Sequence, residues 1–164
     1  MRGKITQYTL KKSAEHILYE IWMFYQTLIL LKTAKRQIEI NILLDAYAVH
    51  ARNLFDFFYP DKKSRPDDMI IYDFIDKLKI FNRKKTSKKD LLFIRKKANK
   101  QVAHLTYTRN RYSLKTNKIW PFVDIGRKMY QTLNAFYTSL PGPYLKWPKI
   151  IELKKIIDDL NGKI

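Results

Sequence analysis

Apolar residues recur at helical spacing along most of this chain, and the two longest periodic segments come first. The first opens at Ser13, which can cap a helix, and its pattern runs to about Lys35. The second runs from about Arg36 to Tyr59 and stops before Pro60, because a proline disfavours helical geometry in the preceding residue. The middle of the first segment is apolar on every side, which is typical of a helix buried in a bundle or against a partner.

The next periodic segments are shorter and are separated by charged links. A charged loop over residues 60–68 precedes a short apolar helix over residues 69–80, and residues 81–87 form a basic link. Ser87 and Asp90 then resemble a capping box, with Asp in place of the usual Glu. We expect the helix that they open to run to about residue 104 or 106.

The last part of the chain begins with a segment that shows no period. Residues 108–120 predict a loop, and Pro121 suits the first turn of the helix that follows. That helix ends at the Pro-Gly-Pro breaker of residues 141–143, and a final amphipathic helix covers residues 149–160.

The whole pattern predicts an all-α protein, a helical bundle of five to six helices. Only four glycines and six prolines are present, so tight turns are few and long helices are favoured over many short strands. The 164 residues fit one domain, with a core bundle over about residues 13–140 and a C-terminal helix over residues 148–161.

Charge narrows the choice of partner. The chain has 33 Lys and Arg against 15 Asp and Glu, a formal net charge of +18. An excess of this size opposes compaction and usually has a use, and phosphate contacts supply most of the salt-dependent affinity for nucleic acid. We therefore expect RNA as the main partner.

The cysteine content and the apolar stretches of the sequence exclude several classes of site and indicate the cellular location. The chain has no cysteine, which excludes disulfides, thiolate metal sites and a cysteine nucleophile, and its three histidines are scattered. We expect neither a metal nor a cofactor. Residues 1–12 lack an apolar signal core, and the longest apolar stretch, residues 17–31, is interrupted by Glu20 and is too short for a clean membrane span. We expect a cytoplasmic protein without a membrane partner.

Polar residues of the second helix form a first candidate site, at Asp45, His50, Arg52, Asn53 and Asp56. Arg52 and Asp56 are four residues apart and can pair, while His50 and Asn53 share a neighbouring face. Aromatic residues on both sides indicate that this stripe is partly buried, and buried charges need partners or a task. A solvated stripe with a surface ion pair is the alternative.

A second candidate site lies at the predicted end of a later helix, where Asn99, Lys100 and His104 occur together. The helix dipole favours a cationic imidazole there, and the ordinary pKa of histidine suits proton transfer near neutrality. The alternative is a core histidine that bonds a backbone carbonyl.

A basic run from Arg83 to Lys100 leads directly to His104, and further cations follow it. A solubilising face is the alternative, although mixed signs would serve solubility better. An aromatic ring among these cations could stack on a base. The candidate RNA-binding residues are Arg95, Lys96, Lys97, Arg109, Arg111 and Tyr107.

Residues 99–104, Asn-Lys-Gln-Val-Ala-His, resemble the Arg-polar-x-x-x-His motif near the end of a late helix in the HEPN superfamily. His104 matches, whereas Asn99 stands at the arginine position, with Lys100 after it and Arg95 one turn before. The resemblance implies a small helical protein, often dimeric, of a bacterial toxin or phage-defence system. Many such proteins are metal-independent ribonucleases in which the Arg and His of two protomers form one composite site.

This resemblance implies a mechanism in which His104 exchanges a proton with the ribose 2′-hydroxyl or the leaving oxygen. Lys100 or Arg52 would stabilise the charge that grows on the phosphate, and the product would carry a cyclic phosphate. Two other interpretations stay open. The missing arginine favours a non-catalytic RNA-binding or assembly module, and charge complementarity would also suit an acidic partner such as an antitoxin.

The wide apolar surface of the first two predicted helices is larger than a short bundle easily covers. Exposed patches of that size mark interfaces, so the sequence also predicts a homodimer.

Overall fold

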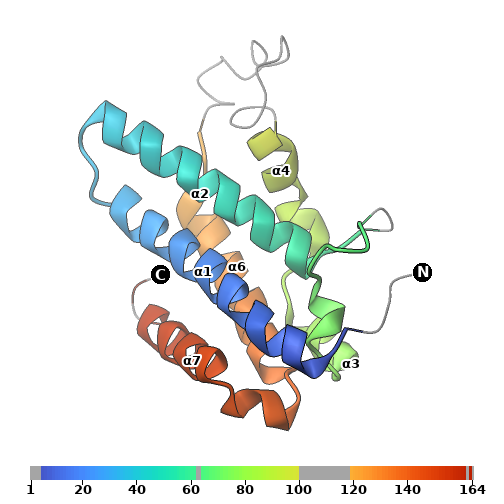
Figure 1. The fold of residues 1–164 in the computed structure, drawn as a ribbon. Helices are drawn as coiled ribbons and strands as arrows, with labels where there is room; N and C mark the ends of the chain where they lie inside the picture. Colours follow the sequence, from blue (N-terminus) through green and yellow to red (C-terminus); the bar gives the residue numbers. More distant parts are fainter. Residues whose placement is uncertain (1–4, 62–63, 100–118, 162, 164) are drawn as a thin grey trace.

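The computed structural model describes residues 5–61, 64–99, 119–161 and 163 (Figure 1). Within these ranges the chain forms six α-helices and two 3-10 helices and contains no strand, which confirms the predicted all-α bundle. The HEPN-like arrangement itself stays a prediction.

Helices α1 (Gln7–Leu31) and α2 (Gln37–Phe58) form a long antiparallel hairpin. The first helix begins earlier than predicted, because the Thr6 hydroxyl accepts a hydrogen bond from the Thr9 amide at 3.2 Å. Ser13 therefore lies inside the helix and does not cap it. The buried residues Leu10 and Ala14 continue the apolar stripe upstream.

The predicted helix over residues 69–80 is wrong. The chain instead forms the short 3-10 helix η1 (Ile71–Asp73) and then α3 (Leu78–Lys84), which takes up most of the predicted basic link. The Asp73 carboxylate accepts a hydrogen bond from the Ile70 amide at 3.2 Å, and the Phe74 amide donates to the Ile71 carbonyl at 3.0 Å. These bonds fix a tight turn and buried side chains at a spacing of three, which the apolar pattern alone does not distinguish from a helix.

Helix α4 (Lys88–Ala98) begins where predicted, since the Ser87 hydroxyl accepts from the Lys89 amide at 3.3 Å. Its predicted end near residue 104 lies outside the described residues. The predicted helix after Pro121 is confirmed as α6 (Phe122–Thr138), and η4 (Gly142–Lys146) leads to α7 (Pro148–Leu160).

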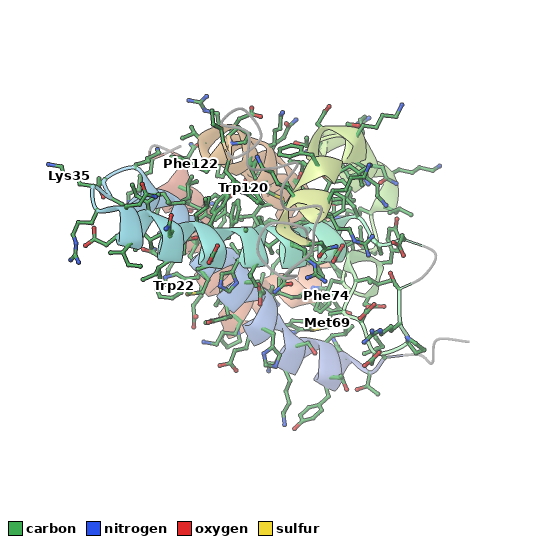
Figure 2. All side chains as sticks on the ribbon, turned by 90° about the horizontal axis from the view of Figure 1, so that it is seen from above. Trp22, Lys35, Met69, Phe74, Trp120 and Phe122 are labelled. Carbon is green, nitrogen blue, oxygen red and sulfur yellow. The ribbon has the colours of Figure 1, made fainter. Side chains whose placement is uncertain are left out.

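The core lies between the α1–α2 hairpin and the remaining helices (Figure 2). Helix α2 contacts α1 and α4, and α6 contacts α1, α3 and α7. Aromatic rings fill the centre, where Phe57 and Phe58 each meet Phe136 edge to face. Gly126 lets α6 approach α1 closely, because a Cβ there would lie 2.5 Å from a Leu28 methyl group.

Apolar side chains also remain on the outer surface of the hairpin. Trp22 is 45% exposed and Ile42 is 61% exposed, and the same surface exposes Tyr19, Leu30, Ile38 and Val49. The homodimer stays a prediction, to which these residues give a location. None of the helices in the described ranges combines the length and apolar character needed to cross a membrane.

A buried polar network joins the end of α2, the link before α4 and α6. The Tyr59 hydroxyl donates to the Thr86 carbonyl at 2.8 Å and lies 2.9 Å from the Thr132 hydroxyl. The Thr86 hydroxyl donates in turn to the Lys128 carbonyl at 2.8 Å. Buried polar groups that are fully paired in this way fix one arrangement of the surrounding helices.

The Tyr59→Phe variant tests this network. It keeps the ring but removes the hydroxyl, so we expect the free energy of unfolding to fall by about 1–2 kcal/mol. Burial raises the pKa of Tyr59 from 10.0 to about 12, so the folded protein holds the phenolic proton more tightly than the unfolded chain. The stability of the wild type should therefore fall as the pH rises from about 10 to about 12, and the variant should lack the Tyr59 share of that fall.

Denaturant unfolding of both proteins at neutral and alkaline pH measures the two effects. Equal stability of the wild type and the Phe variant at neutral pH would contradict the structural role of this network.

Candidate functional site

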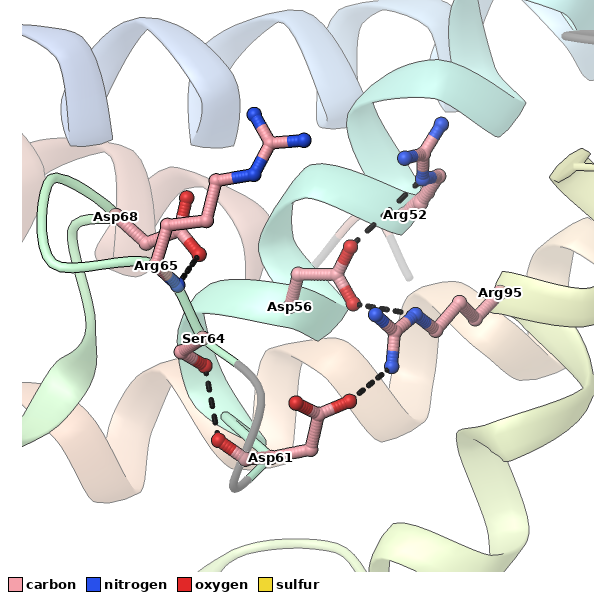
Figure 3. A network of polar contacts seen from close by, with 7 residues as sticks. All are labelled: Arg52, Asp56, Asp61, Ser64, Arg65, Asp68 and Arg95. Atoms are coloured by element: carbon pink, nitrogen blue, oxygen red, sulfur yellow. Dashed lines mark hydrogen bonds and ion pairs between the residues drawn. The ribbon is translucent and has the colours of Figure 1, made fainter.

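Charged side chains from α1, α2, α4 and the loop after α2 surround an open hollow of about 520 Å³ (Figure 3). Three of them are arginines and four are carboxylates. The charged lining residues are Glu20, Arg52, Asp56, Asp61, Arg65, Asp68 and Arg95. Asn53 and Ser64 add polar groups to the same wall. The hollow is therefore a polar concavity with charges of both signs.

Arg95 links the elements that form this hollow. Its Nε lies 3.1 Å from Oδ1 of Asp56 on α2, and its Nη1 lies 2.6 Å from Oδ2 of Asp61 in the following loop. The hydrogen bond that Arg95 donates to the Asp61 carboxylate raises the pKa of Arg95. Arg95 was predicted to bind RNA, but its guanidinium is held here by two carboxylates and joins α4 to α2.

Arg52 forms the predicted pair with Asp56, with 3.7 Å between Nε and the carboxylate oxygen Oδ2. The Nε atom is buried and has no hydrogen-bond partner, so the two side chains are ion-paired without an aligned hydrogen bond. Among the residues drawn in Figure 3, no hydrogen bond or ion pair reaches the two terminal nitrogens of Arg52, which lines the hollow.

His50 is held by a carboxylate from the neighbouring helix. Its Nδ1 lies 2.8 Å from Oε2 of Glu20, and the Asn53 amide donates to the same oxygen at 3.1 Å. A carboxylate can only accept, so Nδ1 carries the proton of this bond. The ring is 8% exposed, and Tyr19 packs edge-on against it.

The second ring nitrogen of His50 is left open. Among the described residues no hydrogen bond reaches Nε2, yet this atom is not among the polar atoms sealed from solvent without a partner. Glu20 fixes the tautomer and the orientation of the ring, and Glu20 lines the hollow although His50 itself does not. Asp45, which was grouped with His50 in the sequence, is exposed and does not line the hollow.

The second predicted site is only partly described. Asn99 follows α4 directly, and its side-chain oxygen is buried without a hydrogen-bond partner. Lys96 is exposed, whereas the Lys97 ammonium donates to the Ile119 carbonyl and lies over the Trp120 ring at 5.3 Å. Burial lowers the pKa of Lys97. The remaining predicted residues, Lys100, His104, Tyr107, Arg109 and Arg111, lie outside the described residues.

Positive charge is concentrated beside the hollow rather than inside it. The segment from Lys77 to Lys97, which covers α3 and α4, has ten basic residues and one acidic residue. The hollow itself carries one carboxylate more than it has arginines. In the part of the chain that the structure describes, no cluster of three or more His, Asp or Glu side chains is arranged to hold a metal ion.

Sequence reasoning missed the residues that come from other segments, namely Glu20, Asp61, Arg65 and Asp68. One signal was present for Glu20, because it interrupts the longest apolar stretch of the chain at a helical position. For Asp61, Arg65 and Asp68 the sequence offered a weaker signal, which was their position in a charged segment directly after α2.

Searches with protein-family models, among curated proteins and among solved structures found no match to this chain. The resemblance to the HEPN superfamily therefore rests on the motif residues alone.

The pKa of Asp56 tests the ion network. Burial raises this pKa above its ordinary value of 3.8, while Arg95 and, to a smaller extent, Arg52 lower it. The Arg95→Gln variant removes the larger opposing charge, so we expect the pKa of Asp56 to rise further. Because the folded-state pKa of Asp56 lies above its unfolded value, the contribution of Asp56 to stability falls as the pH rises from the unfolded pKa to the folded pKa. This pH interval should be wider in the variant.

A carboxyl-detected NMR titration measures this pKa, and Lys96→Gln on the same helix is the matched control. An unchanged or lower pKa of Asp56 in Arg95→Gln would show that the two side chains do not interact in solution.

Proposed function

We propose that this chain binds RNA and cleaves it without a metal ion, at the hollow between α2 and α4. The observation that supports this most is the His50 ring, whose Nδ1 is anchored to Glu20 at 2.8 Å while Nε2 stays open. Glu20 also lines the hollow together with Arg52. Glu20 therefore connects the oriented imidazole to the hollow that the arginines line, and an imidazole and a cation are the groups that phosphodiester cleavage requires.

The basic surface of α3 and α4 supports the RNA part of the proposal. Ten basic residues against one acidic residue over residues 77–97 create a field that attracts a polyanion from solution. Arg95 carries the ion network on the same helix, so a backbone drawn to the lysines of α4 would pass the hollow. Affinity of this origin falls steeply as the salt concentration rises.

The reaction needs a base and an acid. A base removes the proton of the ribose 2′-hydroxyl, and the resulting oxygen attacks the adjacent phosphorus. The 5′-oxygen of the next nucleotide leaves and takes a proton from the acid, which yields a 2′,3′-cyclic phosphate and a free 5′-hydroxyl. We assign one proton transfer to Nε2 of His50 and the other to His104, which the motif resemblance supplies, while Arg52 stabilises the charged transition state.

Cleavage of a fluorescent RNA in EDTA tests this assignment. Removal of a general acid or base typically costs about 10²- to 10⁴-fold in rate, so we expect losses of this size for both His50→Ala and His104→Ala. His16 is exposed on α1 and serves as the matched control, so His16→Ala should cleave like the wild type. An RNA with 2′-deoxy sugars should resist cleavage because it lacks the attacking hydroxyl.

RNA affinity should be nearly unchanged in all three variants. If His104→Ala cleaves as fast as the wild type, the motif resemblance does not identify a catalytic residue. If His50→Ala does so, the Glu20–His50 pair is structural.

A non-catalytic RNA-binding module is the second candidate function. Asn99 at the arginine position of the motif favours it, as does the pairing of Arg95 with two carboxylates. Salt-sensitive RNA binding without cleavage would support this function, and indifference to RNA would favour an acidic protein partner such as an antitoxin. A role in a toxin or phage-defence system, and a homodimer with a composite site, would follow from the resemblance.

A further inference from the structure

Two arginines of the hollow differ from the third in how their guanidinium groups are used. Arg95 binds Asp56 and Asp61 at 3.1 and 2.6 Å, so its donors are directed at protein carboxylates. Arg52 and Arg65 also line the hollow, and among the residues drawn in Figure 3 no hydrogen bond reaches the Arg65 guanidinium or the terminal nitrogens of Arg52. Arg52 pairs with Asp56 through Nε, so these remaining donors can bind a ligand.

The backbone that carries Arg65 is fixed even though the side chain is exposed. Its amide donates to Oδ2 of Asp68 at 2.6 Å, and the Asp68 amide donates back to the Arg65 carbonyl at 3.2 Å. Pro66 occupies the second position of this turn, where its fixed φ angle is favourable. The Arg65 side chain thus starts from a defined point on the rim.

The turn is also tied to the helices. The Ser64 hydroxyl donates to the Asp61 carbonyl at 3.0 Å, and the Asp61 carboxylate holds Arg95 of α4. Arg52 is held from α2 by its ion pair with Asp56, which turns its Nε edge toward the protein. The opposite edge of Arg52, with both terminal nitrogens, is left for an acceptor with two neighbouring oxygens, such as the two non-bridging oxygens of a phosphodiester.

We propose that Arg52 and Arg65 form a fork that binds a phosphate group in this hollow, and that the group is a backbone phosphodiester of RNA. Guanidinium groups bind phosphate with two parallel N–H donors, which matches the free edge of Arg52. The choice of RNA rests on the proposed function, through the basic surface of α3 and α4. The choice of phosphate rests on the Arg65 guanidinium and on the two terminal nitrogens of Arg52, both at the hollow.

Binding of a short 2′-O-methyl RNA, which cannot be cleaved through its 2′ position, tests the fork by fluorescence anisotropy. A lost charge-assisted contact should raise the Kd about tenfold in Arg65→Ala and in Arg52→Ala. The slope of log K against log salt should fall by about 0.7 for each lost contact. Arg65→Lys keeps the charge but not the two-donor edge, so its affinity should lie between Arg65→Ala and the wild type.

The matched control is Arg36→Ala. Arg36 precedes the first turn of α2, pairs with Glu39 at 3.2 Å and is not among the residues of the hollow. The Arg36→Ala variant removes the same charge from the chain as Arg65→Ala. Equal effects of the two variants on the Kd for RNA would therefore overturn the fork. Because Arg65 is exposed and its guanidinium makes no hydrogen bond or ion pair with the other residues drawn in Figure 3, its variants test binding without loss of the fold.

A terminal phosphate offers the same chemistry from another source. The RNA is therefore compared with and without a 5′-phosphate. If Arg65→Ala weakens only the 5′-phosphorylated RNA, the backbone assignment is wrong.

The outcomes also separate the fork from the ribonuclease. Binding that depends on Arg65, without any cleavage of natural RNA, supports the fork and contradicts catalysis. If natural RNA is cleaved but RNA affinity does not change in the Arg65 variants, the fork is contradicted and the ribonuclease proposal is not.

Discussion

The guanidinium of Arg95, held between Asp56 and Asp61, is the interaction on which the candidate site depends. One cation satisfies two carboxylates from two segments, and so it fixes the loop after α2 against α4. All three side chains are about one-third exposed, so the pair adds little to global stability. Its consequence is positional, because it holds the loop after α2 in place and offsets the charge of two carboxylates that would otherwise repel a phosphate.

The packed frame behind the site makes that positioning possible. Helix α2 places Phe55 and Phe58 in the core and Arg52 and Asp56 at the hollow, so one helix links the dry interior to the polar wall. The Tyr59 network then ties the end of α2 to α6. Rotation of α2 would expose apolar rings and break this network, which restrains the direction of its polar side chains.

Local patterns were predictable and long-range contacts were not. Helices α2, α6 and α7 followed from apolar spacing and prolines, and the pairing of Arg52 with Asp56 followed from their separation of four residues. The 3-10 turn at Asp73 was missed because its capping bond depends on a single side chain. The bonds from Glu20 to His50 and from Asp61 to Arg95 span 30 and 34 residues, and a sequence of charges does not say which will meet.

In the proposed site the carboxylates occupy Arg95, while Arg65 and the terminal nitrogens of Arg52 bind RNA. The decisive experiment is an NMR titration of the arginine side-chain Nε–Hε signals with 2′-O-methyl RNA, because each guanidinium reports separately. We expect the Arg52 and Arg65 signals to move with added RNA while the Arg95 signal stays in place. Movement of the Arg95 signal as large as that of the other two would show that the carboxylates release it, and would contradict this division of roles.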